Sequence, residues 1–190
     1  MVGQERNTPR PKLRRSDSMN MLEHALEYAA HGWAVIPLQG IDGGQCTCAK
    51  VDCSSPGKHP IPSNGSKAAT IDVAEIRAWW AAHPNANIGI ATGAKSGIIV
   101  IDVDHGPDKS GYASLEALQT ENGIIPQQMC VRTGSGGLHI YLSAPGQEIR
   151  NSASALAPNI DVRGEGGYVV APPSLHLSGK LYVWENTYGV

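Results

Sequence analysis

The spacing of apolar residues in the first half of the chain predicts two amphipathic helices. Asn20 can cap the first helix, with Glu23 three residues later to complete a capping box. Asp72 and Glu75 repeat this arrangement before the second helix, which Pro84 closes. The residues expected on the buried faces are Leu22, Ala25, Leu26 and Ala29 in the first helix and Ile76, Trp79 and Trp80 in the second.

Shorter apolar runs predict strands in the rest of the chain. The first of these runs are residues 33–38, 87–93 and 98–104. Residues 129–144 and 159–174 each contain two strand-like runs joined by a glycine-rich turn, which is typical of a β-hairpin. One more short helix is expected at residues 114–123. Because helices dominate the first half and hairpins the second, the sequence predicts an α+β fold with a mixed or antiparallel sheet.

Composition limits the class of protein. A chain of 190 residues with 41% hydrophobic and 17% charged residues is long enough for one globular domain with a real core. No apolar run reaches the roughly 20 residues that span a bilayer, and the polar N-terminus lacks the apolar stretch of a secretory signal. Four cysteines are too few for a disulfide-stapled secreted domain. We therefore expect a cytoplasmic protein without a membrane partner.

Charge is distributed unevenly along the chain. Five of the 15 Lys and Arg residues lie within residues 1–15 against one acidic residue, so the remainder has a net charge of −6. An acidic remainder argues against a protein that grips duplex DNA through many phosphates. Residues 1–18 are polar and proline-containing, and we expect a disordered basic tail that is either solvated or in contact with nucleic acid.

Two acidic residues close the most strand-like run, "IIVIDVD" at residues 98–104. Alternate side chains of a strand share a face, so Asp102 and Asp104 lie side by side and repel each other unless a cation or a shared proton offsets the charge. Such pairs bind Mg²⁺ or Mn²⁺, although aspartates also end strands simply as turn formers. Asp161, in another apolar run, is a third candidate ligand, or else the partner of Arg163 in a local salt bridge.

The glycine-rich turn that precedes residue 138 is a candidate anion-binding site. Its backbone N–H groups can approach a phosphate because glycine has no side chain, and Ser135 adds a hydroxyl donor. Gly136 and Gly137 follow, and His139 projects from the outgoing strand. The turn predicts a triphosphate cradle. An ordinary hairpin turn beside a structural histidine is the alternative interpretation.

Three of the four cysteines and one histidine fall within 14 residues of each other. These residues are Cys46, Cys48, Cys53 and His59. They have the ligand number and the chemistry of a closed tetrahedral zinc site, although their spacing is not that of a common zinc finger. The sequence therefore predicts a structural zinc ion in the segment 42–62, with unliganded surface thiols as the alternative. Cys130 lies in a strand pattern and is expected to be buried.

Several motifs occur in an order that resembles one known family. They are "GKHP", "NIGIATG", "IIVIDVD", "TGSGGLHIYL", "DVRGEGGYVVAPPS" and a final Gly-x-x-Tyr-x-Trp. With them, residues 20–186 resemble the bifunctional DNA primase/polymerase domains of phage and plasmid replication proteins, in the archaeo-eukaryotic primase superfamily. The resemblance implies that residues 19–190 form an RRM-like catalytic core with a small zinc-binding insertion. It also implies nucleotidyl transfer from dNTPs or NTPs to a primer 3′-hydroxyl.

The same resemblance implies roles for individual residues. The implied ligands of two Mg²⁺ or Mn²⁺ ions are Asp102, Asp104 and Asp161. His139 and Arg163 would contact the triphosphate of the incoming nucleotide. The family's second motif is usually Ser-x-His, whereas Gly137 stands two residues before His139 here. Phosphate binding would then fall to Ser135 or to the backbone amides of the turn, at Gly136 and Gly137.

The resemblance further implies a single-stranded DNA template with its primer as partner, and a helical segment and a helicase that follow in related proteins. The setting would be the cytoplasm of the host cell. Two other classes stay open from the residues alone. A metal-dependent nuclease or nicking enzyme uses similar acids and histidines, and a non-catalytic zinc-containing module binds nucleic acid through a surface that should be basic.

Overall fold

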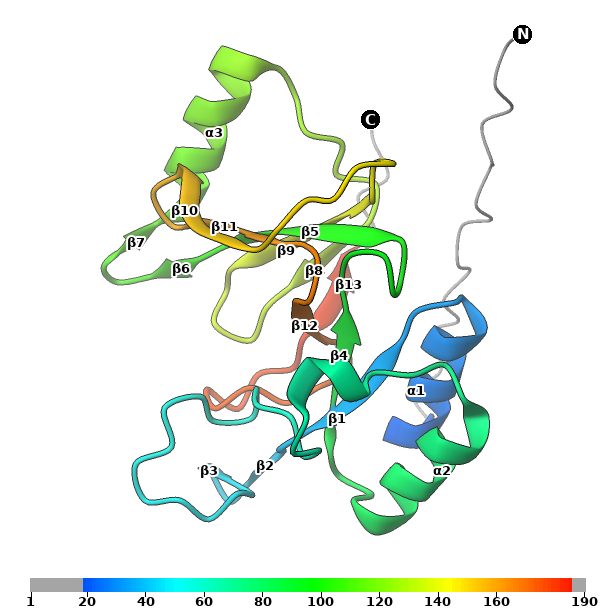
Figure 1. Cartoon of the computed structure of the whole chain (residues 1–190). Helices are drawn as coiled ribbons and strands as arrows, with labels where there is room; N and C mark the ends of the chain where they lie inside the picture. Colours follow the sequence, from blue (N-terminus) through cyan, green and yellow to red (C-terminus); the bar gives the residue numbers. More distant parts are fainter. Residues whose placement is uncertain (1–18, 186–190) are drawn as a thin grey trace, which may run out of the picture.

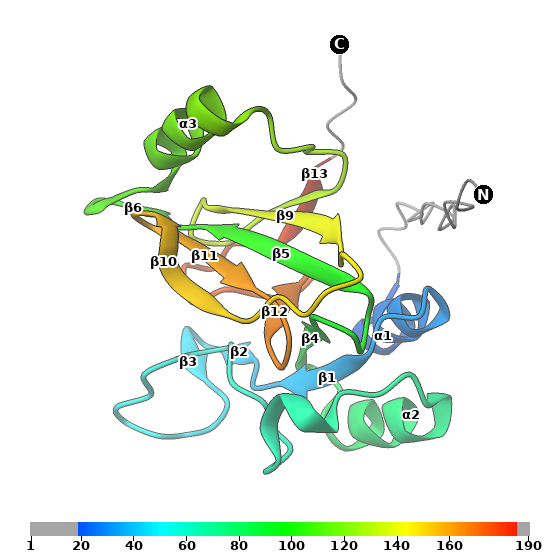
Figure 2. The same ribbon diagram turned by 45° about the horizontal axis from the view of Figure 1, so that its top comes forward.

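The structure, a computed structural model, describes residues 19–185 and contains two main antiparallel sheets that share a core (Figures 1 and 2). The basic tail predicted at residues 1–18 lies outside the described residues. The helices are α1 (Met21–Ala30), α2 (Val73–Ala82), α3 (Gly111–Asn122) and a short 3₁₀ helix, η1 (Gly65–Ala68). The strands are β1 (Val35–Leu38), β2 (Ile41–Asp42), β3 (Gln45–Cys46), β4 (Asn87–Ala91), β5 (Ile98–Val103), β6 (His105–Gly106), β7 (Lys109–Ser110), β8 (Cys130–Arg132), β9 (Leu138–Ser143), β10 (Ser152–Ala157), β11 (Ile160–Arg163), β12 (Tyr168–Ala171) and β13 (Val183–Glu185).

Helices α1 and α2 pack beside the three-stranded sheet, whose order is β1-β4-β12 (Figure 1). Both helices begin where the sequence predicts. The Asn20 side chain accepts a hydrogen bond from the backbone N–H of Glu23, at 3.0 Å, and Asp72 accepts one from Glu75, at 2.9 Å. The predicted apolar residues face the core: four are buried and three pack at its edge. The buried ones are Ala25, Ala29, Ile76 and Trp80, and those at the edge are Leu22, Leu26 and Trp79.

The six-stranded sheet has the order β10-β11-β5-β9-β8-β13, with β5 between β11 and β9. One face of this sheet carries Ile101, Val103 and Ile140, which form a second core with Leu115 of α3. The opposite face carries Val100, which belongs to the core of the three-stranded sheet. Since alternate residues share a face, Asp102 lies on the face that looks toward the smaller sheet.

Strands β11 and β12 do not form the hairpin that the sequence predicts at residues 159–174. β11 pairs with β5 and β10, whereas β12 pairs with β4 in the other sheet. The glycines between them allow close packing at this crossover, because a Cβ on Gly164 would lie 2.1 Å from the Ile149 carbonyl oxygen and one on Gly167 would lie 2.3 Å from Asn151 Oδ1. The other predicted hairpin, β8 with β9, is confirmed.

The fold is therefore a mixed α+β arrangement of antiparallel sheets, as the sequence predicts. The segment predicted to bind zinc follows β1, and its regular structure is limited to the short β2–β3 hairpin. Within residues 19–185 no helix combines the length and the apolar character needed to cross a membrane.

Candidate active site and candidate metal site

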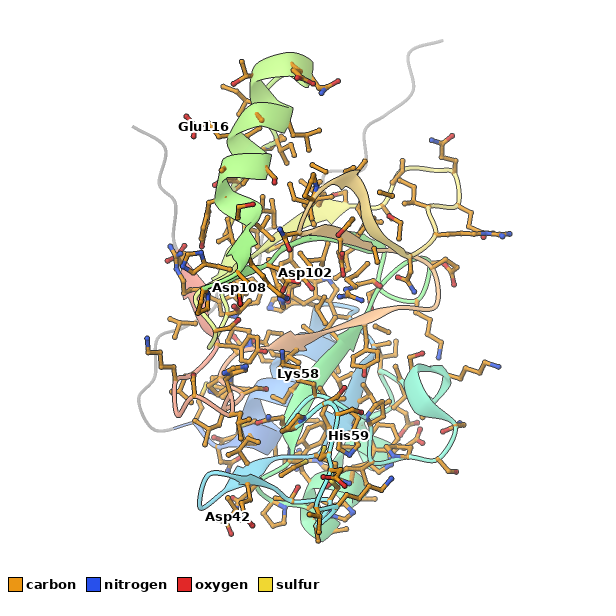
Figure 3. The ribbon with its side chains drawn as sticks, turned by 90° about the vertical axis from the view of Figure 1, so that its left-hand side faces the viewer. Asp42, Lys58, His59, Asp102, Asp108 and Glu116 are labelled. Atoms are coloured by element: carbon orange, nitrogen blue, oxygen red, sulfur yellow. The ribbon has the colours of Figure 1, made fainter. Side chains whose placement is uncertain are left out.

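Asp102 lies in the central strand β5 with candidate residues on both neighbouring strands. In the register of the sheet it is paired with His139 of β9 on one side and with Asp161 of β11 on the other. Directly paired residues of adjacent strands project from the same face. The sheet therefore gathers three of the predicted site residues around Asp102, which Figure 3 shows near the middle of the molecule.

Arg163 connects two of these acidic side chains. Its Nη2 lies 3.0 Å from Asp102 Oδ2 and 2.9 Å from Asp161 Oδ2. The two carboxylates are only 16% and 17% exposed, so the guanidinium offsets a repulsion that solvent screens poorly. The local salt bridge between Asp161 and Arg163 that the sequence suggested is present, and it extends to Asp102.

Asp104 directly follows β5, and its carboxylate contacts a cation from the β6–β7 hairpin. Its Oδ2 lies 2.6 Å from Lys109 Nζ, and both side chains are partly exposed. Its backbone N–H donates to the Asn159 carbonyl, and its own carbonyl accepts from Gly111 N–H. Gly111 is needed there, because a Cβ would lie 2.2 Å from the Asp104 carbonyl oxygen. The backbone of Asp104 is thus fixed, while its side-chain contact is of the weak, exposed kind.

His139 is buried beside Asp102, with its Nε2 3.5 Å from Asp102 Oδ1. Burial lowers the pKa of His139; Asp102 opposes this, and the positive charges of Arg163 and Lys58 lower the pKa further. The imidazole is therefore neutral at neutral pH, with one nitrogen as donor and the other as acceptor. Among the described residues, His139 Nδ1 has no hydrogen-bond partner. A buried nitrogen in that state costs free energy unless a ligand or a water molecule pairs with it.

A cavity of about 450 Å³ lies in front of this face of the sheet, a volume typical of small-molecule sites. Its wall on the sheet side includes Asp102, Asp104, His139 and Arg163. The facing wall is built by segments far away in the sequence: the predicted zinc-binding segment, β12 and the loop before β13. The residues that these segments contribute include Ser55, Lys58, Tyr168, Val169, Val170 and Tyr182.

Asp161 is not part of the cavity wall. Its Oδ1 accepts a hydrogen bond from Ser154 N–H at 2.9 Å, and its Oδ2 is bound to Arg163. The structure therefore places Asp161 beside Asp102, as the sequence suggested, but ties both of its oxygens to protein donors. An ion shared by the two carboxylates would have to take the place of Arg163.

The glycine-rich turn between β8 and β9 packs against the end of β5. A Cβ on Gly137 would lie 2.4 Å from the Val103 carbonyl oxygen, and Gly136 has a φ of 93° that favours glycine. Ser135 Oγ lies 3.0 Å from Thr133 Oγ1, and both side chains line the cavity. The turn thus presents the Ser135 hydroxyl to the cavity, while Gly136 and Gly137 fix its shape and do not line the cavity.

Several cavity residues with polar side chains were not predicted from the sequence, among them Lys58, Tyr168 and Tyr182. Tyr182 is buried, with its ring centroid 6.0 Å from that of His139. It belongs to the Gly-x-x-Tyr-x-Trp motif. That motif contributes to the family resemblance, but it does not show where Tyr182 lies in the fold. Lys58 directly precedes the predicted zinc ligand His59, but this position in the sequence does not show that it faces the cavity.

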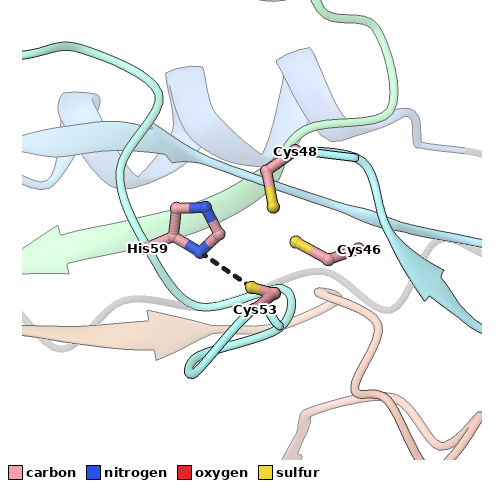
Figure 4. A group of neighbouring side chains, drawn as sticks. All are labelled: Cys46, Cys48, Cys53 and His59. Carbon is pink, nitrogen blue, oxygen red and sulfur yellow. Dashed lines mark hydrogen bonds between the residues drawn. The ribbon is translucent and has the colours of Figure 1, made fainter. Parts of the chain in front are cut away.

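The four predicted zinc ligands come together at a second place, and Figure 3 shows one of them, His59, below Lys58 and Asp102. The ligand atoms of the Cys₃His cluster, formed by Cys46, Cys48, Cys53 and His59, all lie within 4.8 Å of one another (Figure 4). His59 Nδ1 lies 3.8 Å from Cys53 Sγ. Tetrahedral zinc, with bonds of about 2.0–2.3 Å, spaces its ligand atoms roughly 3.3–3.8 Å apart. The cluster could therefore bind a metal ion such as zinc after a small adjustment.

The surroundings of one cluster thiol, Cys46, favour the thiolate, whereas burial and the neighbouring thiols raise the pKa of Cys53. Burial alone would raise the pKa of Cys46, but hydrogen bonds from the backbone of Cys48 and Gly57 and from the neighbouring thiols outweigh it, so the pKa is lowered. Gly57 N–H lies 3.5 Å from Cys46 Sγ. A lowered pKa favours the thiolate, which is the form that binds metal.

Alkylation should separate the four cysteines by their reactivity. Cys130 is fully buried, and burial raises the pKa of its thiol to about 11, so the reactive thiolate is scarce at neutral pH. We expect iodoacetamide to leave Cys130 unmodified in the folded protein, to modify the cluster cysteines only after metal is removed, and to modify all four in denaturant. Peptide mass spectrometry measures this. Rapid modification of Cys130 in the folded protein would contradict the burial that the structure shows.

Comparison with known proteins adds one finding to this geometry. Residues 25–188 match a family model described as bifunctional DNA primase/polymerase, N-terminal. The match covers the whole cavity wall, the acidic residues and the Cys₃His cluster. A search of curated proteins gave no match.

Proposed function

The chain belongs to the bifunctional DNA primase/polymerase N-terminal family, and we propose that it catalyses template-directed nucleotidyl transfer from dNTPs or NTPs to a primer 3′-hydroxyl. The observation that carries the proposal is the position of Asp102. It lies in the wall of a nucleotide-sized cavity, between His139 and Asp161 on the neighbouring strands, and Asp104 lines the same cavity.

We assign Asp102 and Asp104 as ligands of divalent ions, with Asp161 as the third ligand. The donor set consists of carboxylate oxygens only, which suits Mg²⁺ or Mn²⁺ better than a soft metal. Lys109 is no obstacle, because an exposed ion pair such as its contact with Asp104 contributes only about 0–1 kcal/mol. Ions bound there would lower the pKa of the primer 3′-hydroxyl and stabilise charge on the leaving pyrophosphate.

The other polar residues on the sheet side of the cavity would bind the triphosphate. The planar guanidinium of Arg163 matches pairs of phosphate oxygens, and it becomes available when divalent ions balance the charge of Asp102 and Asp161. His139, which is neutral, can donate one hydrogen bond, and Ser135 offers a hydroxyl at the mouth of the glycine-rich turn. The nucleophile is the primer hydroxyl, so no covalent enzyme intermediate is needed.

We further propose that the six-stranded sheet with α3 on one face is the RRM-like catalytic core of the primase superfamily, within a domain of residues 19–190. The Cys₃His cluster would be its structural zinc site, since thiolate and imidazole ligands suit zinc. A primed single-stranded DNA template is the proposed partner. In this proposal a helical segment and a helicase follow in the full-length phage or plasmid replication protein, in the host cytoplasm.

Primer extension tests the proposed activity. A labelled primer annealed to a single-stranded template should lengthen when Mn²⁺ or Mg²⁺ and dNTPs are present, and it should stay intact when nucleotides are omitted. Shortened strands without nucleotides would indicate a nuclease or nicking enzyme instead. DNA binding with neither reaction would indicate a non-catalytic module. An unprimed template run in parallel separates initiation from extension.

A further inference from the structure

Lys58 lies between the two sites that the structure brings together. It lines the cavity opposite the acidic residues, and the next residue in the chain, His59, belongs to the Cys₃His cluster. Figure 3 shows this order, with Asp102 above Lys58 and His59 below it. A single peptide segment therefore connects the candidate metal site to the cavity.

Three consecutive carbonyl groups hold this segment in place. The Gly57 carbonyl accepts a hydrogen bond from Asn87 Nδ2 at 2.9 Å, and the His59 carbonyl accepts one from Gln39 N–H at 2.9 Å. Between them, the Lys58 carbonyl accepts one from the hydroxyl of Tyr168, at 3.0 Å. These donors belong to β4, to β12 and to Gln39, the residue directly after β1, so the three-stranded sheet fixes one side of the segment.

The metal cluster fixes the other side. Gly57 N–H contacts the sulfur of Cys46, and His59 supplies the imidazole of the cluster. The residue before Lys58 is thus hydrogen-bonded to a candidate metal ligand, and the residue after it is itself a candidate ligand. A bound ion would restrain this backbone further, because hydrogen bonds to ligand atoms and the ligands themselves set the orientation of a metal site. Without the ion, the loop-rich segment has little core of its own to hold it.

Lys58 differs from the other cationic residues in the cavity wall because they are paired with carboxylates. Lys109 is paired with Asp104, and Arg163 is paired with Asp102 and Asp161. Among residues 19–185, no carboxylate lies within ion-pair distance of Lys58 Nζ. Its charge acts across the cavity all the same. Burial lowers the pKa of His139 most, Asp102 opposes this, and Arg163 and then Lys58 lower the pKa further. The facing wall therefore presents a cation with no counter-ion.

We propose that Lys58 binds the triphosphate of the incoming nucleotide, and that the Cys₃His metal site holds it in position to do so. The inference rests on the proposed nucleotidyl transfer and adds a ligand from outside the six-stranded sheet. Divalent ions at the acidic wall would draw the triphosphate into the cavity, and Lys58 would neutralise its oxygens from the facing wall. The metal cluster then contributes to substrate binding as well as to folding.

Binding measurements on Lys58→Ala test the first half of the proposal. Titration of a dNTP with Mn²⁺ should show about 10- to 100-fold weaker binding than in the wild type, as expected when one charge-assisted contact is lost. Binding of the matching deoxynucleoside monophosphate should change little. Lys50→Ala is the matched control, because Lys50 is exposed in the same segment and does not line the cavity. Circular dichroism and metal content check that each variant is folded and loaded.

Three results of these binding measurements would contradict the role of Lys58 or the proposed function on which it rests. If Lys58→Ala binds the dNTP as tightly as the wild type, Lys58 is not a triphosphate ligand. Equal weakening of monophosphate and triphosphate would also overturn the assignment. If the wild type itself shows no Mn²⁺-dependent binding of dNTPs, the proposed function fails, and the inference falls with it.

A double-mutant cycle tests the second half. Cys48→Ser, which removes a metal ligand, should weaken dNTP binding by a factor similar to that of Lys58→Ala. In the double variant the two effects should not add, because both act through the same ammonium group. If Cys48→Ser leaves dNTP affinity unchanged, or if the effects multiply, the metal site does not position Lys58. Removal of zinc from the wild type, followed by reloading, should lower and then restore the affinity without any mutation.

Discussion

Replacing Asp102 by asparagine is expected to lower the rate of nucleotide incorporation by about 100-fold or more, while the protein stays folded. The substitution removes a negative charge from the cavity wall where the proposed divalent ions bind. Asparagine keeps the shape of the side chain, and its amide oxygen can still accept from Arg163. Arg163 also keeps Asp161 as its charged partner, so no buried cation is left unpaired.

Primer extension at saturating dNTP and Mn²⁺, together with the melting temperature, measures this prediction. The matched control is Asp108→Asn. Asp108 is exposed in the turn between β6 and β7 and does not line the cavity (Figure 3). Full activity of the Asp102 variant, or an equal loss in both variants, would show that this carboxylate has no special role.

Loss of the metal from the Cys₃His cluster is expected to have the largest effect on stability. At a free zinc concentration about 1,000 times the dissociation constant, binding adds about 4.1 kcal/mol to the free energy of unfolding. In a chain of this size each kcal/mol moves the melting temperature by about 2–4 °C. We therefore expect Cys48→Ser to lower the melting temperature by about 8–16 °C.

Calorimetry and metal analysis of the purified proteins test this prediction. Wild-type protein should contain one zinc ion per chain and the Cys48 variant none. Chelator should lower the melting temperature of the wild type and leave that of the variant unchanged. Ser54→Ala is a suitable control, since Ser54 is exposed in the same segment and is not a ligand. A zinc-free wild type with an unaltered melting temperature would contradict a structural zinc site.

The local parts of the fold could be predicted because their signals are local. The caps at Asn20 and Asp72 involve residues three positions apart, and the β8–β9 hairpin joins neighbouring strands. The partner of β12 could not be predicted in this way. Apolar alternation shows which side of a strand is buried, but it does not show which strand lies next to it. The chain crosses between sheets at Gly164, where the sequence resembles an ordinary turn.

The residues of the candidate site also divide into those that local sequence patterns predict and those that they do not. Asp102 and Asp104 could be paired from their spacing in one strand, and the cluster cysteines from their short separation along the chain. The contribution of Lys58 could not be predicted from the sequence, since it depends on how the segment after β1 folds against β12. The Arg163 bridge between Asp102 and Asp161 depends likewise on a strand register that no local pattern encodes.

The proposed catalysis requires that Asp102, Asp104 and Asp161 share divalent ions beside the cavity. A crystal structure with Mn²⁺ and a non-hydrolysable dNTP, recorded at the manganese absorption edge, tests it most directly. We expect anomalous density within about 2.6 Å of the carboxylates of Asp102, Asp104 and Asp161, with Arg163 turned from the acids toward the triphosphate. Manganese bound elsewhere, with Arg163 still between Asp102 and Asp161 while the nucleotide is bound, would contradict it.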